Sequence, residues 1–102
     1  MTAKYAPRAL HDLETILRGI GVHSPQGATN VALAIKRAVG SCAIFPRAAP
    51  RTDEPDLHRK PIGKYPYTIF YRIVGDGYDI EIVRVVHSAR IRSLAQMPTE
   101  DV

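Results

Sequence analysis

The fold of this chain is decided by residues 67–87, which read YTIFYRIVGDGYDIEIVRVVH. Two runs rich in β-branched and aromatic residues, Tyr67–Val74 and Tyr78–His87, flank the turn sequence Gly75-Asp76-Gly77. Runs of this composition favour β-strands, and Asp-Gly between two of them is typical of a tight hairpin turn. The stretch therefore predicts an antiparallel β-hairpin.

The register of this hairpin follows from matching side chains across it. A two-residue type I′ turn at Asp76-Gly77 sets three pairs opposite each other: Ile73 with Ile80, Tyr71 with Ile82 and Arg72 with Glu81. A shift by one residue would instead place Tyr71 against Glu81. We prefer the first register because it joins apolar to apolar and opposite charges to each other.

In this register the two faces of the hairpin differ in character. One face is mainly apolar and is expected to pack on helices: Tyr67, Ile69, Tyr71, Ile73, Ile80, Ile82 and Val86. Arg84 falls at the end of that face unless a β-bulge redirects it. The opposite face mixes apolar and charged residues: Phe70, Val83, Val85, Arg72, Glu81 and His87. We expect a partner to pack there, with cover by the Arg47–Leu57 loop or a terminal helix as the alternative.

Two helices are predicted before the strands, at Pro7–Arg18 and Pro25–Ala43. Apolar residues recur in each at three- and four-residue spacing, beginning in the first helix with Leu10 and Leu13. We expect Gly19 and Gly21 to end the first helix, and Ser24-Pro25 to cap and begin the second. The short connection predicts an antiparallel helix hairpin. The fold class is therefore α+β, a helix hairpin on one face of a small twisted antiparallel sheet.

The remaining segments carry weaker signals. Arg47–Leu57 lacks periodicity and is predicted to be a loop, and His58–Ile62 is a weak strand that Pro61 confines to a sheet edge. Ser88–Leu94 is a short terminal helix in this interpretation, and Pro98–Val102 a frayed tail.

Composition limits the class of protein. Hydrophobic residues make up 45% and charged residues 24% of the 102 residues, which is typical of one globular domain, here 1–102. No apolar run approaches the roughly 18 residues of a membrane span, and the N-terminus lacks the apolar core of a secretory signal. We therefore expect a cytoplasmic protein without membrane contact. A single cysteine, Cys42, fits a reducing compartment.

Positive charge is concentrated in the second half of the chain. The net charge is +4, and nine of the fourteen Lys and Arg residues lie between Arg47 and Arg92. This distribution indicates either a polyanionic or acidic partner or simply a soluble basic protein.

Four short pieces of the second half occur in a recognisable order: Arg59-Lys60-Pro61-Ile62, Tyr65-Pro66-Tyr67, Ile69–Ile73 and Ile82–Arg90. Together they resemble the ParE-like branch of the RelE/ParE superfamily, the toxins of type II toxin–antitoxin systems. The first half is similar too, in Pro7–Leu10, Asp12-Leu13 and a helix that ends at Phe45-Pro46. Each piece is weak alone, whereas the ordered set, which covers residues 5–94, is fairly specific.

The resemblance implies two helices against a twisted antiparallel sheet, growth inhibition, plasmid stabilisation and no cofactor. It also implies a cognate antitoxin whose disordered C-terminal segment folds onto the toxin. The mixed face of the hairpin is where we expect that segment, on Phe70, Arg72, Val83 and Val85.

Two activities divide the superfamily. ParE-like members poison DNA gyrase, whereas RelE-like members cut messenger RNA on the ribosome. RNA cleavage needs a base, an acid and cations, for which His87, Arg84 and Arg90 are the candidates. For His87 the structural alternative is a strand-end residue bonded to backbone, and for Arg72 it is the pair with Glu81.

Contacts to the target are expected from four cations: Arg59, Lys60, Arg84 and Arg90. Arg84 and Arg90 have no acidic neighbour in the predicted register. The spacing of His11, His23 and His58 fits no metal site, and no metal is predicted. The two long helices resemble those of ParE-like members, and this resemblance favours a gyrase inhibitor that is not an enzyme. An mRNA endoribonuclease and a non-toxic basic binding module are the alternatives.

Overall fold

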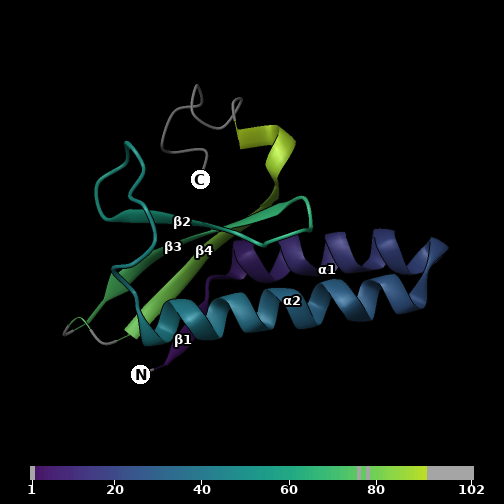
Figure 1. The fold of residues 1–102 in the computed structure, drawn as a ribbon, viewed down its shortest axis with the longest axis horizontal. Coiled ribbons are helices and arrows are strands. Elements are labelled where there is room, and N and C mark those ends of the chain that lie inside the picture. The colour runs from purple at the N-terminus through teal and green to yellow at the C-terminus, as the bar shows by residue number, and fades with distance from the viewer. Residues whose placement is uncertain (1, 76, 78, 92–102) are drawn as a thin grey trace.

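The computed structural model describes residues 2–75, 77 and 79–91. Its elements are, in order, β1 (Ala3–Tyr5), α1 (Pro7–His23), α2 (Pro25–Ile44), β2 (Leu57–Pro61), β3 (Tyr67–Val74), β4 (Asp79–His87) and the 3-10 helix η1 (Ser88–Arg90). Figure 1 shows α1 and α2 side by side along one face of the sheet. The predicted α+β class is confirmed.

The sheet has four strands in the order β1-β4-β3-β2. β2, β3 and β4 are antiparallel, as predicted, but β1 adds a parallel strand on the free edge of β4, with Ala3 opposite Ile80 and Tyr5 opposite Ile82. Ala6 N–H continues the pairing to Ile82 O at 2.9 Å. The sequence did not reveal β1 because three residues are too few for a periodic pattern. The strand forms because the otherwise unpaired edge of β4 supplies its hydrogen bonds.

Both helices are longer than predicted. α1 runs through Gly19 and Gly21 to His23, so the prediction that these glycines end the helix was wrong. A glycine inside a helix costs about 1 kcal/mol, which the surrounding packing offsets. The predicted cap of α2 is confirmed, because Ser24 Oγ accepts a hydrogen bond from Gly27 N–H at 2.9 Å. Leu10 is 53% exposed, and the buried stripe of α1 begins at Ala9 instead.

The hairpin register is confirmed next to the turn and changes farther along. Ile73 lies opposite Ile80, Tyr71 opposite Ile82 and Arg72 opposite Glu81. Gly75 and Gly77 have φ angles of 66° and 95°, which suit glycine in a tight turn. Between Phe70 and Tyr71 the register shifts, because Phe70 pairs with Arg84 and leaves Val83 as the extra residue of a β-bulge.

The bulge exchanges the faces of two valines. Val85 was predicted on the face away from the helices and Val86 on the helix side, and both placements were wrong. Val85 is 1% exposed in the core beneath the helices, whereas Val86 packs with Phe70 on the opposite side. An extra residue in one strand reverses the alternation of every side chain beyond it.

The helix-side core joins α1 and α2 to the sheet. Its buried members are Ala9, Val31, Ile35, Val39, Cys42, Ile62, Ile69, Tyr71, Ile80, Ile82 and Val85. Tyr71 is fully buried there and donates from its hydroxyl to Pro46 O at 2.6 Å. Burial raises the pKa of the Tyr71 phenol far above its ordinary value, so the hydroxyl remains a donor.

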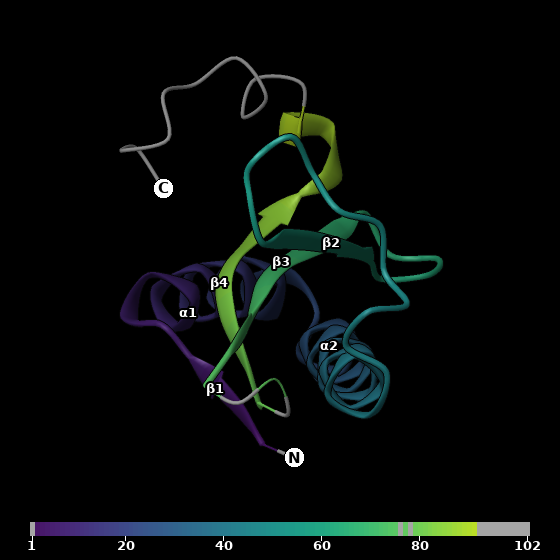
Figure 2. The same cartoon turned by 90° about the vertical axis from the view of Figure 1, so that its left-hand side faces the viewer.

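The loop after α2 covers the outer edge of β2. Arg59 N–H donates to Pro50 O at 3.0 Å and Thr52 N–H to Leu57 O at 2.8 Å. The prediction that β2 is an edge strand is confirmed, and the loop satisfies part of the hydrogen bonding of this edge. Figure 2 shows this loop rising beside β2, with η1 beyond the end of β4. The predicted terminal helix is confirmed over Ser88–Arg90. Asp76, Tyr78, residues 92–94 and the predicted tail Pro98–Val102 lie outside the described residues.

Candidate functional site

The side of the sheet away from the helices carries a small apolar cluster, called here the outer-face cluster. It consists of Leu57, Phe70, Val83 and Val86, with Ile91 packed against it. Phe70 is 8% and Val83 9% exposed, because the cluster members and Ile91 shield one another. The expectation of an uncovered apolar face is therefore corrected in part. Leu57, the last residue of the predicted loop, and Ile91, which directly follows η1, supply part of the cover named as the alternative.

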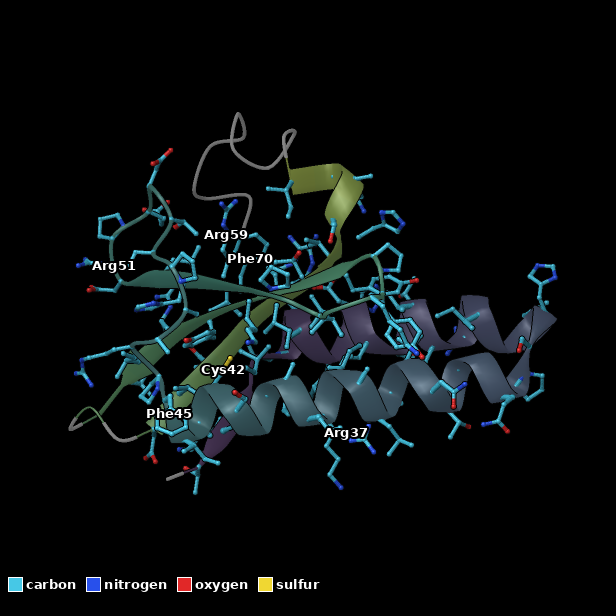
Figure 3. All side chains as sticks on the ribbon, in the orientation of Figure 1. Arg37, Cys42, Phe45, Arg51, Arg59 and Phe70 are labelled. Atoms are coloured by element: carbon cyan, nitrogen blue, oxygen red, sulfur yellow. The ribbon has the colours of Figure 1, made fainter. Side chains whose placement is uncertain are left out.

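Two exposed arginines border this cluster. Arg59 lies opposite Phe70, and Arg72 lies opposite both Leu57 and Glu81. Figure 3 places Arg59 and Phe70 together on the side of the sheet away from α2. The register brings Arg72 and Glu81 into the predicted pairing, yet no ion pair within 4.0 Å joins them in the described part of the chain. The outer face is thus an apolar centre with a basic rim.

Lys60 does not belong to this rim. It lies opposite Ile69, whose side chain is in the helix-side core, and it is half-buried. Successive residues of a strand point to opposite faces, so Arg59 and Lys60 cannot contact one flat partner together. The two cations that the sequence groups as target contacts therefore lie on opposite faces of β2.

Arg84 has an acidic partner that the register alone did not reveal. Its Nε donates to Asp12 Oδ2 at 2.8 Å and its Nη2 to Asp12 Oδ1 at 3.3 Å. Asp12 Oδ2 also accepts from Val85 N–H at 3.0 Å. The two side chains are 8% and 10% exposed, so this is a nearly buried, bidentate ion pair between α1 and the bulge. The inference that Arg84 lacks an acidic neighbour was wrong.

Sequence reasoning missed the role of Asp12, although a signal was present. Asp12 lies three residues after the buried Ala9 and four before Ile16, which packs on the core. An acidic residue on the buried face of a helix must find a cation or several N–H donors. What the sequence could not show is that the bulge delivers Arg84 and the Val85 N–H to that place.

At the far end of β4, His87 is exposed and bonded to nearby backbone. Its Nδ1 accepts a hydrogen bond from Ala89 N–H at 3.2 Å, which matches the structural alternative given for this residue. Its ring meets the Tyr67 ring edge to face at 5.5 Å between centroids. Beside it, the hydroxyls of Thr68 and Ser88 lie 2.9 Å apart.

Arg90 lies in η1, three residues after His87, and is exposed. Within residues 2–75, 77 and 79–91, no three His, Cys, Asp or Glu side chains gather closely enough to hold a metal ion. Over the same residues, no helix has the length and apolar character needed to cross a membrane.

Comparison with known proteins gives concordant results. A family model described as "ParE toxin of type II toxin-antitoxin system, parDE" matches residues 3–92. The chain is 40% identical over 84 residues to Toxin RelE2 of Caulobacter vibrioides, a match that covers 82% of this chain and 91% of that protein.

Solved structures show the same fold at low sequence identity. The chromosomal ParDE system of P. aeruginosa matches with a TM-score of 0.72 and 22% identity over 85% of this chain and 95% of that one. The isolated RelE toxin of E. coli matches with a TM-score of 0.63 and 16% identity over 93% and 94% of the two chains. The toxin–antitoxin complex RelBE of E. coli gives a TM-score of 0.62 at 16% identity, over 84% and 94%.

Proposed function

The chain belongs to the ParE toxin family of type II toxin–antitoxin systems, and from this membership we propose that it arrests growth by inhibiting DNA gyrase. We also propose that a cognate antitoxin neutralises it. The helix hairpin of 17 and 20 residues supports the gyrase branch, because long helices are typical of the ParE-like members it resembles.

The observation that carries the proposal is the sequestration of Arg84. A nuclease needs cations that can reach the scissile phosphate, together with an acid and a base. Arg84 is instead nearly buried and held by Asp12, and Nδ1 of His87 is engaged by Ala89 N–H. Of the two arginines considered for RNA cleavage, Arg84 is therefore unavailable to a scissile phosphate and Arg90 alone is exposed near His87, which supports an inhibitor over an enzyme.

Two exposed cations are the proposed contacts to the target. Arg59 on β2 and Arg90 on η1 are both exposed, and neither forms an ion pair with a described carboxylate, so each can reach an acidic or phosphate group. Arg84 acts indirectly in this proposal, by fixing the shape of β4. Lys60 is assigned no contact on the same surface, because it faces the helix side.

The proposed antitoxin site is the outer-face cluster and its rim. An antitoxin segment that lies over Phe70 and Val83 would bury their remaining exposed area, and its acidic residues would meet Arg59 and Arg72. Solved structures with the same fold include toxin–antitoxin complexes. Val85 is not part of this site, because it lies beneath the helices.

Gyrase supercoiling by purified enzyme tests the target directly. We expect the toxin to abolish supercoiling and to trap cleaved DNA, and Arg90→Gln to reduce that inhibition. Arg37→Gln is the matched control, because Arg37 is also exposed but projects from α2 away from the sheet (Figure 3). Unimpaired supercoiling in the presence of folded toxin would contradict the gyrase proposal.

A ribosome-dependent mRNA endoribonuclease is the second candidate, since the 40% identical relative carries the name Toxin RelE2. A ribosome-programmed cleavage assay run in parallel separates the two activities. Cut mRNA with unaffected gyrase, and loss of cutting in His87→Gln, would establish the nuclease and give His87 a catalytic role.

A further inference from the structure

A hollow of about 560 Å³ lies at the opposite end of the sheet from His87. It is lined by Arg47, Arg51, Asp56, His58, Ile73, Gly75 and Gly77. We propose that this hollow binds the phosphate group of a nucleotide, either free or within a nucleic-acid strand. None of its lining residues belongs to the outer-face cluster, its basic rim or the His87 end, so the proposal does not rest on gyrase as the target.

Two cations face this hollow from the loop that follows α2. Arg47 and Arg51 are exposed, and no described carboxylate lies within 4.0 Å of either guanidinium. The loop that carries them is anchored at both ends. Pro46 O accepts from the Tyr71 hydroxyl, and Arg51 forms a β-bridge with His58. Guanidinium groups on such an anchored loop suit phosphate, because their planar N–H donors match its oxygens in pairs.

His58 supplies a buried polar group at the wall of the hollow. It is 6% exposed and stacks on the Tyr71 ring, with 5.2 Å between centroids and 15° between planes. Its Nδ1 lies 2.9 Å from Ala49 O, and because a carbonyl oxygen only accepts, Nδ1 carries the hydrogen. The position and tautomer of the ring are therefore fixed before any ligand arrives.

The other ring nitrogen of His58 completes the chemistry. No described residue forms a hydrogen bond with Nε2. With the hydrogen on Nδ1, Nε2 is left as an acceptor for a hydroxyl of the ligand, either a protonated phosphate oxygen or a sugar hydroxyl. A nucleotide whose phosphate is bound by Arg47 and Arg51 can thus also be contacted by His58.

The remaining lining favours a nucleotide over inorganic phosphate. The hollow falls in the usual range for small-molecule sites, roughly 300–1,000 Å³, which is larger than one phosphate needs. Ile73 and the two turn glycines give an apolar, side-chain-poor wall for a sugar or base. Asp56 is exposed and can accept from a sugar hydroxyl, but it also lowers the net positive charge that a phosphate meets.

Titration of the full chain with adenosine 5′-monophosphate, followed by NMR of the histidine ring nitrogens, tests the proposal. We expect Nε2 of His58 to shift while the rings of His11, His23 and His87 do not. Adenosine without phosphate should produce no such shift. Tighter binding of a short single-stranded oligonucleotide would identify a nucleic-acid strand as the source of the phosphate, and tighter binding of the mononucleotide would identify a free nucleotide.

Substitutions test the same proposal by whether each one weakens or strengthens binding of the mononucleotide. Arg47→Gln and Arg51→Gln should each weaken binding of the mononucleotide about tenfold, the loss expected for one charge-assisted hydrogen bond. Asp56→Asn should strengthen it, and the control Arg37→Gln, which removes an equal charge elsewhere, should leave it unchanged. An unshifted His58, equal binding of adenosine, or an equal loss in Arg37→Gln would overturn the proposal.

Discussion

The two faces of the sheet differ in how they are covered. The helix side is sealed by α1 and α2, and its central residues Ile69, Ile80 and Ile82 are fully buried. The outer face has a cluster of four residues that is closed by Ile91 and bordered by exposed Arg59 and Arg72. The continuous buried core on the helix side stabilises the fold. The small outer-face cluster with its basic rim leaves a surface on which a partner can pack. The difference separates residues that hold the fold from residues available for binding.

The largest effect is expected at the pair that joins α1 to the bulge. Asp12→Ala leaves the Arg84 guanidinium nearly buried without its carboxylate, and should lower the free energy of unfolding by about 3–5 kcal/mol. Urea denaturation measures it. Arg8→Ala is the control, because Arg8 is exposed and lies 3.8 Å from the same carboxylate, and it should cost less than about 1 kcal/mol. Equal losses in the two variants would contradict a special role for Arg84.

Two valines on either side of the bulge compare the faces directly. Val85→Ala opens a cavity in the helix-side core and should cost about 2–3 kcal/mol of unfolding free energy. Val83→Ala makes the same chemical change in the outer-face cluster, next to solvent, and should cost about 1 kcal/mol. The same denaturation experiment measures both. A larger loss for Val83 would mean that the outer face, not the helix side, limits stability.

Antitoxin binding should depend more on Val83 than on Val85, the reverse of the order expected for stability. Val83→Asp places a charge in the proposed antitoxin site and should weaken antitoxin binding by more than about 2 kcal/mol, because a buried carboxylate without a partner is costly. Calorimetry with the cognate antitoxin measures this change, with circular dichroism to confirm that the variant is folded. Unchanged affinity in folded protein would move the antitoxin site away from the outer face.

The smallest effect is expected at Arg72. Its cross-strand neighbour Glu81 is in register but forms no ion pair with it among the described side chains, so Arg72→Ala should change stability by less than about 0.5 kcal/mol. If Arg72 lies at the rim of the antitoxin site, the same variant should slow association and reduce its dependence on salt. A stability loss above 1 kcal/mol would instead assign Arg72 a structural role.

Sequence by itself determined the elements whose signals are local. The hairpin register beside Gly75 and Gly77, the Ser24 cap and the apolar stripes of both helices depend on neighbours a few residues apart, and they follow from composition and spacing. The ordered motifs also identified the family. These features were predictable because turn geometry, capping and amphipathic periodicity act over short stretches of chain.

Only the tertiary structure decided where the bulge falls and what it brings together. Val83 becomes the extra residue, Val85 turns inward and Arg84 reaches Asp12, 72 positions away in the sequence. The pairing of β1 with β4 and the lining of the hollow beside His58 likewise join segments that are distant along the chain. No short stretch encodes such contacts, because a one-residue change of strand register hardly changes the local interactions. The register is fixed only when the helices and the sheet pack against each other.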